Sequence, residues 1–250
     1  MAVMEFLNKN LLNTTSIISV DSSTATAQYL FNRNTELGYT SSGYNSTTST
    51  IISVSFSAAT ILSHVLIQNH NLKDFSVYYN GTTTNSIFSA TTNSATSSYI
   101  GFSSVTVSSI QLKMNNTISG GQEKRVGELV LTNRLLVFER NPTIADYNPM
   151  IFRKQIIHDM PDGGNIIFKI RDKFRTKLSW KYVTEDFINN LYDIFTGLNS
   201  FYFASKPTTT SWDGQAYEVL WVGDFDFRES GNAPDVGFSG SINLNQTTSG

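Results

Sequence analysis

Three histidines could in principle supply a catalytic base or metal ligands, because imidazole titrates near neutral pH and binds transition metals. They are His64, His70 and His158. Their spacing fits no metal-binding or catalytic motif, since one begins a strand-like run, one lies in a short polar turn and one ends a predicted hairpin strand. We therefore expect each histidine to be structural or solvated.

Carboxylates beside aromatic rings are the second candidate, because pairs of carboxylates hydrolyse glycosidic bonds. Asp213, Asp224 and Asp226 lie near Trp212 and Trp221. Asp224 and Asp226 alternate with phenylalanines, however, as residues of a half-buried strand would. The sequence also lacks a nucleophile elbow, a glycine-rich phosphate loop and an HExxH motif. We predict that the chain is not an enzyme, and a glycoside hydrolase ranks third among the functional hypotheses.

The composition excludes several classes of partner. The 250-residue chain has a net charge of −2 and no cysteine. A nucleic-acid or anionic-membrane partner would need a clustered basic face, which this charge does not indicate, and disulfide or thiolate chemistry is impossible. No apolar run reaches membrane-spanning length, and the first twelve residues lack the pattern of a signal peptide. We expect a soluble protein without membrane insertion, which would leave a cell by a route such as lysis.

The first part of the chain is rich in Ser, Thr and Asn, yet short apolar runs recur in it with the spacing of strands. Turn formers such as Asn80-Gly81 separate the runs. Ser and Thr serve as strand residues on the solvated faces of antiparallel sheets. The pattern predicts an all-β sandwich, with apolar runs at 17–20, 51–56, 64–68, 75–79, 105–114 and 126–131.

The composition changes near Phe138, and the chain is long enough for two domains. Residues 139–149 contain two of the five prolines and are predicted to link a first domain at 1–138 to a second at 150–250. The strands expected in the second domain lie at 151–158, 166–170, 217–227 and 236–244.

Residues 174–203 contain the predicted helix of the second domain. The hydroxyl of Thr184 can cap it, and two acidic residues in the first turn suit the helix dipole. Phe187 and Leu191 recur at helical spacing, and Gly197 offers a left-handed stop. Alternating residues on both sides predict a strand–helix–strand unit. The second domain is therefore predicted to be α+β, with one helix packed on a curved or split sheet.

Four segments of the first domain resemble the discoidin or coagulation-factor type C family, which includes galactose-binding-like carbohydrate modules. They are Thr26–Gly43, Thr50–Phe56, Ile61–Gly81 and Val126–Leu131. The resemblance implies an eight-stranded jelly-roll sandwich over residues 1–138. It also implies a carbohydrate ligand, such as host surface polysaccharide.

Modules of this family often hold a structural calcium ion, and the resemblance places its ligands at Asn32, Asn34, Thr35 and Glu128. Asn32 stands where the family usually has aspartate and Arg33 where it has glycine, so the site has lost negative charge and gained a cation. We therefore expect no bound calcium and no other cofactor. Asn32 and Glu128 are instead expected to be hydrogen-bonded in the loop.

Tyrosines could offer a sugar an apolar ring face beside a polar hydroxyl. Tyr39 and Tyr44 are the candidate carbohydrate contacts, and Tyr78 and Tyr79 belong to the same set. The tryptophan that the family usually has near Tyr39 is missing. Packing in the core or at its rim is the favoured alternative for most of these rings.

The second domain resembles the tail-tube and distal-tail proteins of long-tailed bacteriophages, on residues 174–203, 216–227 and 237–246. The resemblance implies a tail-tube-like split barrel or sandwich with one helix, joined edge to edge into a ring-shaped homo-oligomer. Other phage tail proteins would be partners, and the protein would be assembled in the host cytoplasm and located in the virion. Distal-tail proteins commonly place the ring domain first, so the identity of the tail subunit stays open.

The leading hypothesis is a structural virion protein of a phage tail, as a tail-tip, distal-tail or minor tail subunit. Its second domain would make ring contacts, and its jelly roll would project outward. The alternative is a bacterial carbohydrate-binding, lectin-like module without a virion role.

Overall fold

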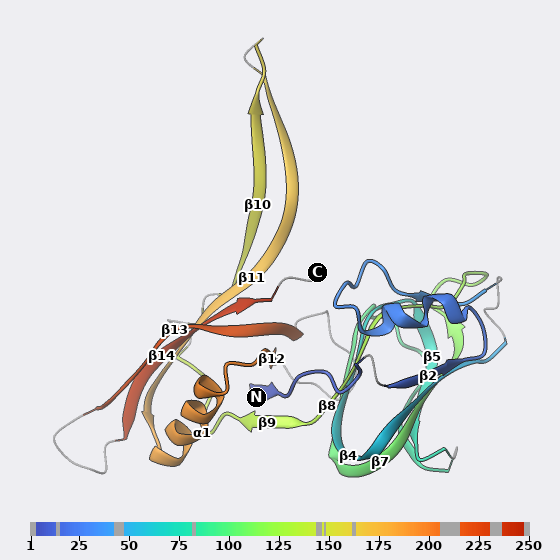
Figure 1. The fold of residues 1–250 in the computed structure, drawn as a ribbon, viewed down its shortest axis with the longest axis horizontal. Helices are drawn as coiled ribbons and strands as arrows, with labels where there is room; N and C mark the ends of the chain where they lie inside the picture. Colours follow the sequence, from blue (N-terminus) through green and yellow to red (C-terminus); the bar gives the residue numbers. More distant parts are fainter. Residues whose placement is uncertain are drawn as a thin grey trace.

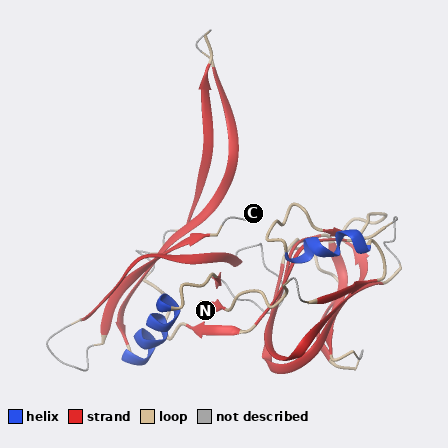
Figure 2. Ribbon diagram, viewed as in Figure 1, coloured by secondary structure: helices blue, strands red, loops and turns tan. Residues whose placement is uncertain are grey.

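A computed structural model describes residues 4–13, 16–42, 48–81, 84–143, 147, 149–161, 164–205, 216–230 and 237–247. Two antiparallel seven-stranded sheets form most of it (Figure 2), so the prediction of a mainly β chain is confirmed. The described helices are α1 (Glu185–Thr196) and the short 3₁₀ helix η1 (Thr24–Phe31). Figure 1 shows the two sheets side by side, with a long hairpin projecting from one of them.

The first sheet folds over itself into a sandwich, which we call the sandwich unit. Its strand order is β3-β8-β4-β7-β5-β6, and β2 pairs with β4. The register of β4 against β7 shifts between Ser55 and Thr60 and again between Leu62 and His64. These irregularities bend the long strands, because a bulge increases the local twist. The strands are β2 (Ile17–Val20), β3 (Tyr39–Thr40), β4 (Thr50–His70), β5 (Leu72–Tyr79), β6 (Ser86–Ala90), β7 (Ser98–Thr117) and β8 (Arg125–Thr132).

Apolar side chains from both layers of the sandwich meet in one core. Ile52, Val54 and Val77 are fully buried there. The runs at 51–56 and 64–68, predicted as separate strands, are parts of the single bent strand β4. The residues between the two runs are mostly polar or small, so the apolar pattern is interrupted there and predicts two strands where the structure has one.

The second sheet and α1 form the sheet–helix unit. Its strand order is β10-β11-β14-β13-β12-β1-β9, and α1 contacts β13. An aromatic core, which includes Phe6, Phe138 and Trp180, fills the space between the sheet and the helix. The strands are β1 (Glu5–Leu7), β9 (Arg134–Val137), β10 (Met150–Asp159), β11 (Asn165–Val183), β12 (Phe201–Ala204), β13 (Ala216–Glu229) and β14 (Phe238–Gln246).

Strands β1 and β9 lie within residues 1–138, the expected first domain, but they belong to the second sheet. β1 pairs with β12 on one side and with β9 on the other. Residues of the expected linker contact the same unit, since the Trp180 Nε1 donates to the Arg140 carbonyl at 3.1 Å and the Thr143 amide donates to the Ser179 carbonyl at 2.9 Å. The chain's first strand thus completes the sheet that its second half builds.

The predicted helix is confirmed at its start and differs at its end. The Phe187 amide donates to the Thr184 hydroxyl at 3.2 Å, which satisfies one of the free amides of the first turn. Phe187 and Leu191 are buried against the sheet. Gly197 is not the left-handed stop, because its φ is −65°. Leu198 takes the left-handed conformation instead, with a φ of 50°.

Candidate functional site

The most conspicuous surface of the molecule is the free part of the β10–β11 hairpin, which we call the arm (residues 150–159 and 165–174). Within the described residues β10 pairs only with β11, and β14 joins β11 only from Arg175 onward. The arm is therefore a two-stranded ribbon with both faces open (Figure 1). Phe174 at the base of the arm is buried, but nine other large apolar side chains of the arm are between 42% and 59% exposed, and they are Met150, Ile151, Phe152, Ile156, Ile157, Ile166, Ile167, Phe168 and Ile170.

The two faces of the arm differ in charge. Cross-strand partners lie on the same face of a ribbon, and successive residues along a strand lie on opposite faces. One face carries Phe152, Ile156 and Phe168 together with basic residues, and the Arg175 guanidinium lies 4.4 Å from the centre of the Phe152 ring. The other face carries an ion pair in which Arg153 Nε lies 3.0 Å from Asp172 Oδ1. We call the first of these the basic apolar face.

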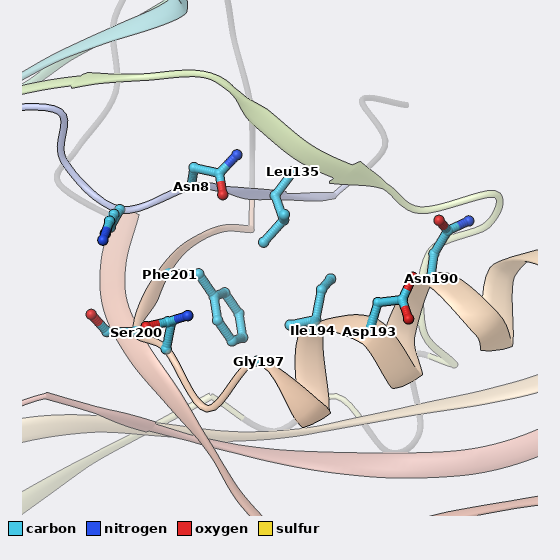
Figure 3. Close-up of a pocket in the computed structure, with 10 residues that line it drawn as sticks. Asn8, Leu135, Asn190, Asp193, Ile194, Gly197, Ser200 and Phe201 are labelled. Atoms are coloured by element: carbon cyan, nitrogen blue, oxygen red, sulfur yellow. The ribbon is translucent and has the colours of Figure 1, made fainter.

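A cleft of about 310 Å³ lies at the C-terminal end of α1, between that helix and the segment that follows β1 (Figure 3). Leu135, Ile194 and Phe201 supply its apolar lining. Asp193 and Asn190 line it from the helix, and Asn8 lies opposite them (Figure 3). The cleft is thus an apolar depression with a polar rim.

A buried polar network holds the two units together. The Tyr99 hydroxyl of the sandwich unit donates to Glu5 of β1. The Arg134 Nε donates to the other Glu5 oxygen at 2.6 Å, and the His64 Nε2 lies 3.4 Å from the first. Burial alone would raise the pKa of Glu5, but His64, Tyr99 and Arg134 outweigh it, so this pKa lies below its usual value. Glu5 therefore stays ionised, with its charge compensated.

A second network joins Glu128 to the other unit. Glu128 on β8 is buried and accepts a hydrogen bond from the Tyr202 hydroxyl at 3.2 Å. Glu218 on β13 lies nearby and pairs with Arg33, whose Nη2 is 3.1 Å from its Oε1. Burial raises the pKa of Glu128 to about 7, the Glu218 charge adds to the shift, and Tyr202 and Arg33 oppose it. This carboxyl titrates near neutral pH.

The four residues that the family resemblance assigned to calcium lie in two different settings. Asn32 accepts from the Asn34 amide at 2.9 Å and donates to the Leu37 carbonyl at 3.2 Å, so its amide group is used within the loop. Asn34 accepts from the Glu36 amide at 3.0 Å. The Thr35 carbonyl accepts from Asn69 at 2.7 Å.

Glu128 differs from the three loop residues, because its partner is Tyr202 of the other unit and not the loop. Arg33 has a φ of 61°, the left-handed conformation that glycine favours. A glycine would adopt this conformation with less strain than the arginine does. Among the described residues, no group of three or more His, Cys, Asp or Glu side chains could hold a metal ion.

The candidate carbohydrate contact within the described residues, Tyr39, does not lie on the surface. Tyr39 is 0% exposed, and its hydroxyl donates to the Ser22 carbonyl at 2.9 Å. A ring in the sandwich core offers no face to a sugar, so Tyr39 has the packing role that was the favoured alternative. Tyr44 lies outside the described residues.

The histidines and aspartates occupy separate places. His64 and His70 are buried, and burial lowers the pKa of His70 to about 4, while His158 lies on the arm against Phe168. Asp226 is exposed and pairs with Arg228 at 2.9 Å. Asp224 lies on the same exposed part of β13, and Asp213 is outside the described residues. None of the helices in the described part is long and apolar enough to span a membrane.

Sequence reasoning placed the hairpin but missed that its apolar residues are exposed. The signal available was a pair of apolar runs, 151–158 and 166–170, each interrupted by basic residues. Sequence reasoning also missed the cleft, because it is built from three distant segments around Asn8, Leu135 and Phe201.

No protein-family model matches the sequence, and no curated protein matches it. Solved structures match about half of the chain. Chitosan-binding module 1 of a chitosanase/glucanase from Paenibacillus sp. IK-5 is 12% identical, with 50% of this chain and 99% of that module covered and a TM-score of 0.45. A module from Clostridium perfringens in complex with GalNAc-β-1,3-galactose is 11% identical, with 47% and 95% covered and a TM-score of 0.40.

A third match is a fucosidase from Ruminococcus gnavus in complex with fucose. It is 16% identical, with 50% of this chain and 26% of the fucosidase covered and a TM-score of 0.41. All three matches cover half of this chain or less, at identities of 16% or less and TM-scores of 0.45 or less.

Proposed function

We propose that this chain is a non-catalytic structural subunit that assembles with copies of itself through the arm. The observation that carries the proposal is the exposure of nine large apolar side chains on a ribbon that no other described element covers. An isolated two-stranded ribbon is at best marginally stable in water, and large exposed apolar patches usually mark protein interfaces. The arm is expected to be stabilised when a neighbouring copy covers it.

The open sheet edges support the same proposal. Strand β10 forms one edge of the second sheet and β9 forms the other. Different edges of two copies can meet head to tail, and such contacts give a ring when the rotation closes. The resemblance of residues 174–203 to tail-tube and distal-tail proteins motivates the site of assembly, a ring in the tail of a long-tailed phage. Detection of the chain in purified virions by mass spectrometry would test that location, and its absence there would reject it.

Sedimentation velocity of the full chain tests self-assembly. The wild type is expected to associate with rising concentration, and the double variant Ile156→Ser/Phe168→Ser is expected to stay monomeric. Ile17→Ser is the matched control, because Ile17 is 71% exposed on the sandwich unit. A monomeric wild type, or equal association of all three proteins, would contradict the proposal.

Carbohydrate binding by the sandwich unit is the second candidate function. A cleft of about 220 Å³ opens where β4 shifts register, and its lining includes Asn13, Ser16, Phe56 and Thr60. Amide and hydroxyl groups suit the hydroxyls of a sugar, and the half-buried Phe56 ring suits its apolar face. The matched modules with chitosan and galactose-containing ligands share this fold, which makes such glycans the first to try.

A glycan array with the full chain tests this candidate. Binding that Phe56→Ala weakens, while Phe88→Ala on the far strand β6 leaves it unchanged, would support the cleft as the site. Binding without assembly would favour a lectin-like module, and assembly without binding would favour a scaffold.

A further inference from the structure

We propose that the basic apolar face of the arm docks on the acidic side of α1 and the adjacent cleft in a second copy of the chain. This inference rests on the proposed function, because it names where the arm goes. The contact is heterologous, since the surface that is offered differs from the surface that receives it.

The two faces of the arm differ in net charge. Over residues 150–174 the sequence has five Lys or Arg and three Asp. Arg153 and Lys169 pair with Asp172 on one face of the ribbon. The opposite face, which carries Lys154 and Lys173 among the apolar side chains, has no carboxylate at its described positions. A surface of this kind fits a partner that is both apolar and acidic.

The sequence of α1 has three acidic residues and no basic one. Within the described residues, the exposed side chains of Glu185, Asp186 and Asp193 form no ion pair closer than 4 Å. Exposed apolar groups accompany them, since Tyr192 is 51% and Leu198 is 84% exposed. The helix thus presents the complement of the arm, with opposite charge beside apolar surface.

The cleft beside α1 could also receive an apolar side chain of the arm. Asp193 stands at its rim, and Leu135, Ile194 and Phe201 line it (Figure 3). Lys9 also lines the cleft, so the acidic charge of the acceptor comes from α1 and not from the cleft as a whole. Its volume of about 310 Å³ is enough to receive a side chain such as Phe168 from the basic apolar face. Leu135 belongs to β9, the open edge of the sheet, so the cleft is continuous with an edge where a strand could be added.

The acceptor must belong to another copy. Ten residues of extended strand span about 33 Å, and Figure 1 shows the arm leaving its sheet in the direction away from α1. To reach its own helix the arm would have to bend sharply at its base, where β14 pairs with β11 from Arg175 onward. Each copy therefore offers one arm and one acceptor, and repetition of the contact builds a ring or a filament.

Charge reversal and charge exchange test the docking site in the full chain. Lys154→Glu on the arm and Asp193→Lys on α1 are each expected to weaken association about tenfold in sedimentation velocity at low salt. The double variant, with the charges exchanged, is expected to return to within about threefold of the wild type. Matched controls are Lys177→Glu and Asp224→Lys, which reverse exposed charges elsewhere on the same sheet.

The outcomes separate the docking site from self-assembly itself. If Ile156→Ser/Phe168→Ser abolishes association but Asp193→Lys behaves like its control, the arm assembles elsewhere and this inference is overturned alone. If the charge exchange fails to restore association, the pairing of these two surfaces is overturned. If neither the apolar nor the charge variants change the oligomer, the proposed function fails together with it.

Discussion

The sandwich core and the arm use the same kinds of side chain in the same kind of antiparallel pairing, with opposite results. Phe75 and Ile110 are 1% exposed in the sandwich, whereas Phe168 and Ile156 are about half exposed on the arm. The difference lies in the layers, because β4, β5 and β7 fold over a common core and the arm has no second layer to face. Apolar residues stabilise a chain only when another layer removes them from water. Burial of the arm's apolar side chains would therefore stabilise an assembly, and a single copy does not bury them.

The largest effect is expected when the two phenylalanines are truncated in turn. Phe75→Ala should lower the free energy of unfolding by about 3–5 kcal/mol, since it leaves a cavity in the sandwich core. Phe168→Ala should cost less than about 1 kcal/mol in the monomer, because little apolar surface is buried around it. Urea denaturation at a concentration below association measures both. Similar losses of unfolding free energy in the two variants would mean that the arm is covered within its own chain. The proposed difference between the arm and the sandwich core would then be wrong.

The second prediction concerns the contact that fixes the two units against each other. The pKa of Glu128 is raised from 4.5 to about 7, so the folded chain keeps a proton that the unfolded chain loses. Stability should therefore fall as the pH rises from about 4.5 to 7 and should be level above that range. At 1.36 kcal/mol per pKa unit the total is about 3 kcal/mol.

Glu5, whose pKa is lowered, contributes with the opposite sign, and its contribution changes below about pH 4.5, outside this range. Glu128→Gln is the comparison that isolates the effect, because glutamine keeps the hydrogen bond to Tyr202 and cannot ionise. The groups that face Glu128 are Glu218, Arg33 and Tyr202. The stability difference between Glu128→Gln and the wild type should grow by about 3 kcal/mol across this pH range. A constant difference would mean that Glu128 is solvated and the junction is open.

Local features of the fold were predictable from the sequence and non-local ones were not. Thr184 predicted the start of α1 from the sequence, because a helix cap depends only on the residue itself and the few residues that follow it. The burial of Tyr39 and the contact between Glu128 and Tyr202 depend on segments far apart in the chain, which no periodicity reports. The membership of β1 in the second sheet is equally non-local. The arm is the instructive case, because an apolar run such as 151–158 has the same pattern whether a layer covers it or not.

The smallest effect concerns the helix on which the arm is proposed to dock. Thr184→Ala removes the hydroxyl that accepts from the Phe187 amide and that also donates to Glu139 at 2.5 Å. The loss should lower the free energy of unfolding by about 1 kcal/mol, measured by urea denaturation of the monomer. Thr196→Ala is the matched control at the other end of α1, where the hydroxyl only donates to the Tyr192 and Asp193 carbonyls. It should change stability by less than half as much, because alanine is the better helix former. Equal losses of unfolding free energy in the two variants would show that the cap hydrogen bond adds no stability of its own. The first turn of α1 would then be stabilised by the packing of Phe187.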